Sequence, residues 1–214
     1  MSKQFWIAVT EFVQTMFDEF ESNQNQKQKQ KQNQTLFTNA CKSGNIELIH
    51  LFLTLTDVDP SADNNKAFLT ACSKGNIAVV NRLLQDSCVD PSAGMNEAIY
   101  LASRYNRIDV VDRLLQDDRV NPSDDNHHLN YPICTASERG NIDIVNRLLQ
   151  DNRVNPSISA NYAIQFASYY GHIAVVDRIL QDSRIYTILN TYAIRKGYIT
   201  GHKDIANLLK NLTP

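Results

Sequence analysis

Ten residues of this chain recur almost unchanged, and this repetition constrains the fold more than any other feature. The copies are LLQDSCVDPS at 83–92, LLQDDRVNPS at 114–123, LLQDNRVNPS at 148–157 and a diverged ILQDSRIYTI at 179–188. A second marker keeps the same interval, with steps of 30 to 34 residues between Gly44, Gly75, Asn106, Gly140, Gly171 and Gly201. Self-similarity at such a period is typical of a repeat architecture.

Each unit predicts two helices that are separated at the marker residue. The first is short, as in NEAIYLAS at 96–103, and an Asn stands where its side chain would cap the amino terminus, at Asn65, Asn96, Asn130 and Asn161. The second, as in NIDIVNRLLQ at 141–150, places its apolar residues along one helical face before an Asn-Pro-Ser turn. Because one such hairpin cannot bury its apolar face alone, we expect the units to stack on one another.

These segments resemble the ankyrin repeats. The Thr-Pro-Leu-His-x-Ala segment of that family is similar to YPICTA at 131–136 and, more loosely, to EAIYLA at 97–102 and YAIQFA at 162–167. Its Gly-His element, followed by an apolar helix, is similar to GHIAVVDRIL at 171–180. The resemblance implies an all-α solenoid of about six helix-turn-helix units. The turns are also similar to those of ankyrin proteins from giant viruses and from bacteria that live inside amoebae.

Composition divides the chain into three segments. Residues 1–21 are expected to form an amphipathic helix, whose apolar side holds Phe5, Val9, Phe12, Val13, Met16, Phe17 and Phe20. Residues 22–34 are a Gln/Asn/Lys-rich linker, either a flexible tether or a helical extension. The array is expected over 35–210, with units near 35–65, 66–96, 97–130, 131–161, 162–191 and 192–210. We expect the first helix to fold back and cap the first unit.

The sequence holds no set of residues typical of catalysis. A Gly-rich phosphate loop, a His-Glu-x-x-His helix and a Cys-x-x-Cys pair are all missing, so we expect no enzyme activity, no cofactor and no metal. Cys41 and Cys72 share one position in successive units and are expected to fill the core. His127 and His128 lie in the longest loop without the spacing of metal ligands. The ankyrin resemblance implies that His172 is structural and bonds to neighbouring turns.

Recognition of another molecule remains as the expected function. By the ankyrin resemblance, the two residues before each marker lie on the concave face of the array, free of the next unit. The candidates for protein binding are Lys42, Lys74, Arg104, Tyr105, His127, His128, Glu138, Arg139, Tyr169 and Tyr170. Arg and Tyr often anchor interfaces, although charged residues on a repeat are as often a solvated surface. We expect a partner that is acidic near Lys74 and Arg104 and apolar or aromatic near Tyr169 and Tyr170.

Charge and cysteine content narrow the setting. A formal net charge of -2 gives no general attraction to nucleic acid or to an anionic membrane, and no apolar run is long enough to span a bilayer. Four cysteines without an export signal predict reduced thiols in the cytoplasm, or in a host cytosol if the source is an intracellular pathogen or a virus. We therefore expect a monomeric, non-enzymatic scaffold that binds another protein through the concave face and the turn tips. The alternative is an adaptor whose amino-terminal helix docks an enzyme complex, such as a ubiquitin ligase, while the array selects a substrate.

Overall fold

The structure, a computed structural model, describes the backbone of residues 3–123, 132–154, 156–182, 184 and 191–211. Within these residues all regular elements are helices. They are α1 (Lys3–Ser43), α2 (Ile46–Leu55), α3 (Ala62–Lys74), α4 (Ile77–Leu83), α5 (Ala93–Arg104), α6 (Ile108–Leu115), α7 (Pro132–Arg139), α8 (Ile142–Leu149), α9 (Pro156–Tyr170), α10 (Ile173–Leu180), α11 (Thr191–Ile199) and α12 (Lys203–Asn211). In the described part of the chain, no helix combines the length and the apolar character that crossing a membrane requires.

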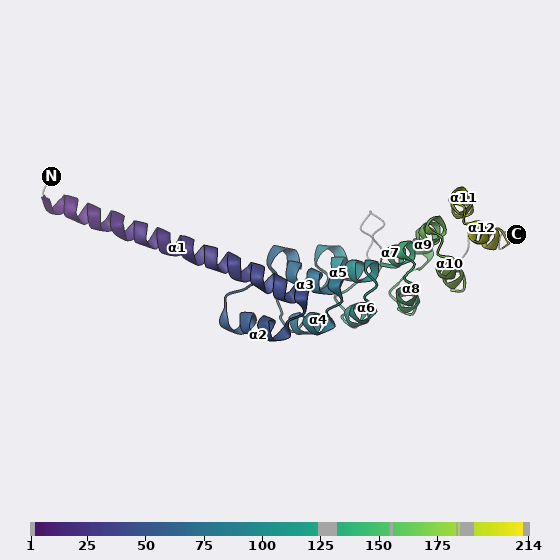
Figure 1. Cartoon of the computed structure of the whole chain (residues 1–214), viewed down its shortest axis with the longest axis horizontal. Helices are drawn as coiled ribbons and strands as arrows, with labels where there is room; N and C mark the ends of the chain where they lie inside the picture. The colour runs from purple at the N-terminus through teal and green to yellow at the C-terminus, as the bar shows by residue number, and fades with distance from the viewer. Residues whose placement is uncertain (1–2, 124–131, 155, 183, 185–190, 212–214) are drawn as a thin grey trace.

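The helices form two layers (Figure 1). The odd-numbered helices from α1 to α11 make one layer, and the even-numbered helices from α2 to α12 make the other. Each helix contacts the helix two places further along the chain, and each odd helix also packs on the even helix that follows it. Neighbours in space are therefore neighbours in sequence, which confirms the predicted all-α solenoid of stacked helix-turn-helix units.

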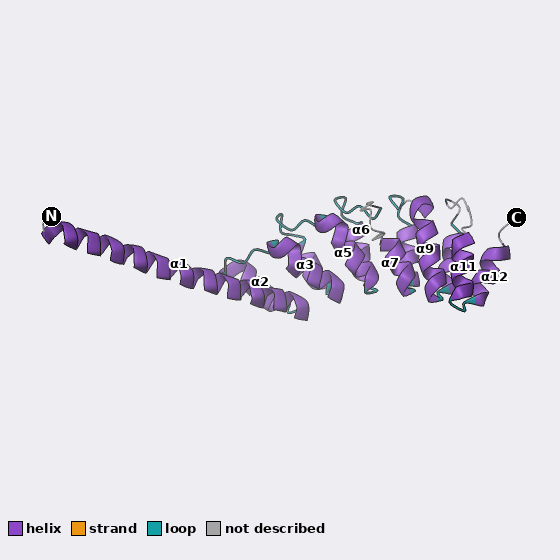
Figure 2. Ribbon diagram, turned by 90° about the horizontal axis from the view of Figure 1, so that it is seen from above, coloured by secondary structure: helices purple, strands orange, loops and turns teal. Residues whose placement is uncertain are grey.

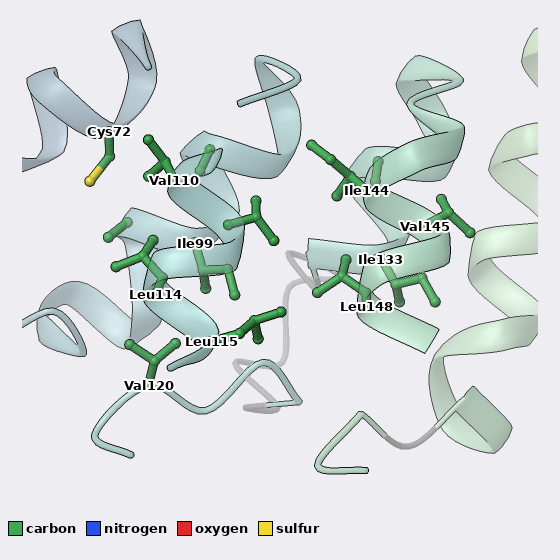
Figure 3. Packing of buried hydrophobic residues seen from close by; sticks show 14 of the residues in the cluster. Cys72, Ile99, Val110, Leu114, Leu115, Val120, Ile133, Ile144, Val145 and Leu148 are labelled. Carbon is green, nitrogen blue, oxygen red and sulfur yellow. The ribbon is translucent and has the colours of Figure 1, made fainter. Parts of the chain in front are cut away.

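Buried aliphatic side chains recur at equivalent places in successive hairpins. Ile99, Val110 and Leu114 in α5 and α6 form one group, and Ile133, Ile144 and Leu148 in α7 and α8 repeat it (Figure 3). All six are 2% exposed or less. Burying a side chain of this size contributes about 1.5–3 kcal/mol. The buried residues form one continuous cluster along the array, so neighbouring hairpins bury each other's apolar faces.

The marker residues end the first helix of each hairpin. Gly44, Gly75, Gly140, Gly171 and Gly201 have φ between +71° and +83°, and Asn106 has φ of +57°. Glycine adopts this left-handed conformation without a Cβ penalty, and Asn tolerates it better than most residues do. The amide of the next residue then bonds back into the helix, as from Asn141 to the carbonyl of Ala136 (2.9 Å). The predicted break at each marker is confirmed.

Asn65 and Asn96 are not the helix caps that the sequence predicted. Each ends a run of three left-handed residues, whereas an amino-terminal cap needs extended backbone angles. Their side chains reach the loop of the next unit instead. Asn96 Oδ1 accepts a hydrogen bond from the amide of Asn121 (2.8 Å), and Asn65 Nδ2 donates to the carbonyl of Asp90 (3.2 Å). The other two predicted caps, Asn130 and the side chain of Asn161, lie outside the described residues.

Helix α1 is unbroken from Lys3 to Ser43, a length of about 60 Å at 1.5 Å per residue. Residues 22–34 lie within it, so the linker is a helical extension and not a flexible tether. The carboxyl-terminal end of α1 is the first helix of the first hairpin, where Phe37 and Cys41 are fully buried. The amino-terminal part projects past the array (Figures 1 and 2). The expected folding of residues 5–20 back onto the first unit is therefore wrong, because no break separates them from the array.

Candidate protein-binding surface

The residue after each marker holds neighbouring units together. Its side chain donates a hydrogen bond to a carbonyl near the end of the first helix of the preceding unit. These bonds join Asn76 to Cys41 (2.9 Å), Arg107 to Ser73 (3.0 Å), Asn141 to Ser103 (2.8 Å) and His172 to Glu138 (3.0 Å). The last carbonyls of a helix lack amide partners within it, so the bonds satisfy groups that would otherwise stay unpaired. The structural role predicted for His172 is confirmed.

A second set of contacts joins the turns. Three arginines each bind the Asp two residues earlier and also donate to carbonyls of the preceding unit, namely Arg119, Arg153 and Arg184. Arg153 lies 2.8 Å from Asp151 and donates to the carbonyls of Leu115 (2.6 Å) and Val120 (3.0 Å). The hydrogen bonds from Arg153 lower the pKa of Asp151 below its ordinary value. This arginine therefore carries its charge partner with it and fixes one turn against the next.

A third set of contacts runs along the even-numbered helices. In each case an arginine Nε donates to an Asn or Asp side chain of the preceding unit. The pairs are Arg113 with Asn81 (3.1 Å), Arg147 with Asp112 (2.5 Å) and Arg178 with Asn146 (2.7 Å). The three sets account for polar side chains that recur at the same place from unit to unit. These side chains are used within the array and are not available to a partner.

The two positions before each marker behave differently, and we call their side chains the first-helix face. Lys42, Lys74, Tyr105, Arg139, Tyr169 and Tyr170 are exposed, and Arg104 and Glu138 are partly exposed. The residue type changes from unit to unit, with cations in the first units and tyrosines in the fifth. The structure places the predicted candidates along one layer, on α1, α3, α5, α7 and α9. His127 and His128 lie outside the described residues.

Local contacts orient some of these side chains. Arg104 Nη1 donates to the hydroxyl of Tyr100 (3.0 Å), which holds the guanidinium over α5. The rings of Tyr169 and Tyr170 meet edge to face with centroids 4.9 Å apart. Both tyrosines are between 41% and 49% exposed, so the paired rings still present an apolar surface with hydroxyl groups to solvent.

A shallow groove of about 380 Å³ lies between α3 and α5 on the same layer. Its lining includes Lys66, Leu69, Thr70, Leu101 and Tyr105. Of these five residues, Tyr105 alone is among the candidates predicted from the sequence. The other four precede the marker by one to three helical turns, and a search limited to the last two positions of each first helix does not reach them.

The cysteines do not form a reactive site. Cys41 and Cys72 are fully buried, which confirms their predicted role in the core. Burial raises the pKa of the Cys41 and Cys134 thiols to about 12 and also raises that of Cys72, so these thiols stay protonated at neutral pH. Among the described residues, no group of three or more His, Cys, Asp or Glu side chains is placed to hold a metal ion.

Comparison with protein families gives one match. A model of the ankyrin repeats, in three copies, matches residues 37–126, which run from the buried end of α1 past α6. No match was found among curated proteins. Ankyrin repeats are general protein–protein interaction modules and are typically non-enzymatic. The match and the stacked helical hairpins together show that the chain is an ankyrin-repeat protein.

Proposed function

We propose that the chain is a non-enzymatic scaffold that binds another protein through the first-helix face and the adjoining turn tips. The observation that supports this function is the division of roles among the polar side chains. Those that recur from unit to unit join the units to one another, whereas those of the first-helix face are exposed and differ between units. A surface that stacking does not constrain is free to match a partner.

The chemistry of the face describes the partner that would fit it. Lys74 and Arg104 favour an acidic segment, and Tyr169 and Tyr170 favour an apolar or aromatic one. The groove beside Tyr105 adds a place for an apolar side chain between these two regions. Arg and Tyr are the residue types that most often dominate the binding energy of an interface. We therefore propose an extended acidic segment that ends in an aromatic or aliphatic anchor.

A charge reversal tests the proposal. The full chain is used to select binders from a random peptide library and to capture a partner from a cell lysate. Arg104→Glu/Arg139→Glu should weaken binding of the selected peptides and of the captured partner by at least tenfold. The matched control reverses two exposed lysines away from the face, Lys29→Glu/Lys203→Glu, and should leave binding within twofold. Equal affinity of the wild type and the Arg104→Glu/Arg139→Glu variant would remove the first-helix face as the binding surface.

The adaptor alternative is favoured by one observation, the projection of α1 beyond the array (Figure 1). A helix with an amphipathic sequence that extends past the repeats is placed to meet a second protein while the array holds the first. Deleting residues 1–21 leaves the contact of Gln34 with Asp59 (2.8 Å), which fixes the middle of α1 to the array. An adaptor would lose its second partner on this deletion and keep its melting temperature and its peptide binding. A fall in the melting temperature, with no partner lost, would instead assign residues 1–21 to stability.

A further inference from the structure

The first hairpin exposes a row of leucines on the side that faces away from the rest of the array. Leu48, Leu51 and Leu55 of α2 are 39%, 50% and 75% exposed, and Leu36 of α1 is 45% exposed. We call these four side chains the N-terminal face. Their spacing on α2, at three and four residues, places the three leucines on one side of the helix. Large aliphatic side chains gathered on one surface mark an interaction site in a soluble protein.

The same positions are buried in the other units. Four residues after the marker, where the first unit has Leu48, the other units have aliphatic residues that are 2% exposed or less, namely Val79, Val110, Ile144, Val175 and Ile205. Eight residues before the marker, where the first unit has Leu36, four other units have alanines that are 1% exposed or less, namely Ala67, Ala98, Ala163 and Ala193. The N-terminal face is therefore the surface through which each other unit packs on the unit before it.

The face is nevertheless not built to receive another ankyrin unit. Leu51 takes the position of Arg113, Arg147 and Arg178, the arginines that bind an Asn or Asp of the preceding unit. Leu55 takes the position of Asp117, Asp151 and Asp182, which hold the arginines that join the turns. Two polar residues that join units are thus replaced by leucines. An apolar occupant fits this surface, and a unit that offers Asn or Asp for an arginine does not.

We propose that the occupant is a second copy of this chain, with the two N-terminal faces packed about a twofold axis. Two α2 helices that run antiparallel would place Leu48 opposite the partner's Leu55 and Leu51 near the axis, so the row is complementary to itself. The acidic residue of α2 is Glu47, at its amino-terminal end. The antiparallel arrangement puts the two Glu47 carboxylates at opposite ends of the interface, where they do not repel. A dimer of this kind differs from the monomer that we expect from the sequence.

A closed twofold dimer is also favoured over a head-to-tail stack. Twofold contacts use the same patch on both copies and end after two, whereas head-to-tail contacts continue into filaments. A head-to-tail stack would need the opposite end of the array to be apolar. There, α12 exposes Lys203, Asp204, Asn207 and Lys210. Charged and amide groups at that end suit water and not a row of leucines.

The size of the face sets the expected strength. Helix α2 has 10 residues and is about 15 Å long, and two helices side by side are about 20 Å wide. The face therefore covers about 300 Å² in projection on each copy, which is small beside the roughly 800 Å² that each partner buries in a standard interface. We expect a dimer that dissociates in the micromolar range, so its population depends on concentration.

Sedimentation equilibrium of the full chain from about 1 to 200 µM, a range that spans micromolar dissociation, tests this inference. The mass should rise from 24.3 kDa toward twice that value. Leu51→Arg/Leu55→Asp introduces the residues that inner units carry at these positions, so the hairpin should still fold, which circular dichroism verifies. The dissociation constant of this variant should be at least tenfold higher than that of the wild type. The control Ile199→Arg changes a residue that is 68% exposed in α11 and should leave the dimer intact.

Three results would overturn the inference. The first is a wild-type chain that stays monomeric at the highest concentration, including one whose leucines are covered by a different protein that copurifies with it. The second is a Leu51→Arg/Leu55→Asp variant that folds and dimerises as strongly as the wild type. The third is a mass that continues to grow beyond two chains, which would show open stacking in place of a twofold axis.

Discussion

Replacing Gly140 by alanine tests how the residue after a marker holds two units together. Gly140 has φ of +71°, and a Cβ added there would lie 2.6 Å from Nδ1 of His172. Two atoms do not approach this closely, so the imidazole ring must move and its bond to the carbonyl of Glu138 (3.0 Å) is lost. Gly44 offers a matched comparison. Its φ is +79°, but an added Cβ would lie 3.4 Å from the side chain of Asn76, an ordinary contact.

The two substitutions share one cost and differ in a second. An L-residue in the left-handed region costs about 1–2 kcal/mol, so Gly44→Ala should lower the free energy of unfolding by roughly that amount. Gly140→Ala also displaces His172 and leaves the Glu138 carbonyl without its donor. A lost hydrogen bond of this kind costs about 1 kcal/mol, and the displaced ring adds to it. We expect Gly140→Ala to cost about 2–4 kcal/mol in total.

Urea unfolding followed by circular dichroism measures both variants. The double variant Gly140→Ala/His172→Ala should cost less than the sum of the two single variants, because removing the ring removes the close contact. If Gly44→Ala and Gly140→Ala reduce the free energy of unfolding equally, the ring at His172 does not restrict the marker. Strict additivity in the double variant would contradict the contact itself.

Paired and buried side chains give three further predictions. Because Arg153 lowers the pKa of Asp151, the ionised carboxylate stabilises the fold above its ordinary pKa, and this stabilisation is lost as the pH falls through the lowered value. Asp151→Asn should therefore be about 1 kcal/mol less stable than the wild type in urea at neutral pH, and the difference should close in acid. In the native protein a thiol reagent should modify the exposed Cys88 first and spare the three buried thiols, Cys41, Cys72 and Cys134, as mass spectrometry of digests would show. Leu148→Ala should lower the free energy of unfolding by about 2–5 kcal/mol in urea titrations, because Leu148 is fully buried and its truncation leaves a cavity.

The solenoid was predictable because its signals are local and repeated. Each marker needs a left-handed residue, and each second helix needs one apolar face, so both requirements appear in the sequence at the same interval. The role of Asn65 and Asn96 was not predictable in the same way. Asn suits both an amino-terminal cap and a left-handed turn. The choice between them depends on a bond to the next unit, which no local pattern records.

The course of α1 was also left open by the sequence. Gln and Lys favour helices, but a polar stretch with no apolar face carries no signal for what it packs against. In the structure, the amide group of Gln34 both donates to the carbonyl of Asp59 (2.8 Å) and accepts from its backbone N–H (3.0 Å). This contact with the α2–α3 loop ties the extension to the first hairpin and favours one continuous helix over a tether.

The exposed surfaces show where a repeat sequence carries functional information and where it does not. Leu48 and Val79 are aliphatic residues at the same position, and only the presence of a preceding unit decides that one is 39% exposed and the other 1%. Residue type at this position therefore cannot identify the N-terminal face. Leu51 is different, because arginine stands at this position in the units that follow. A departure from the repeat at a position that joins units indicates that the neighbour there is not another unit, and the amino-acid sequence alone carries this signal.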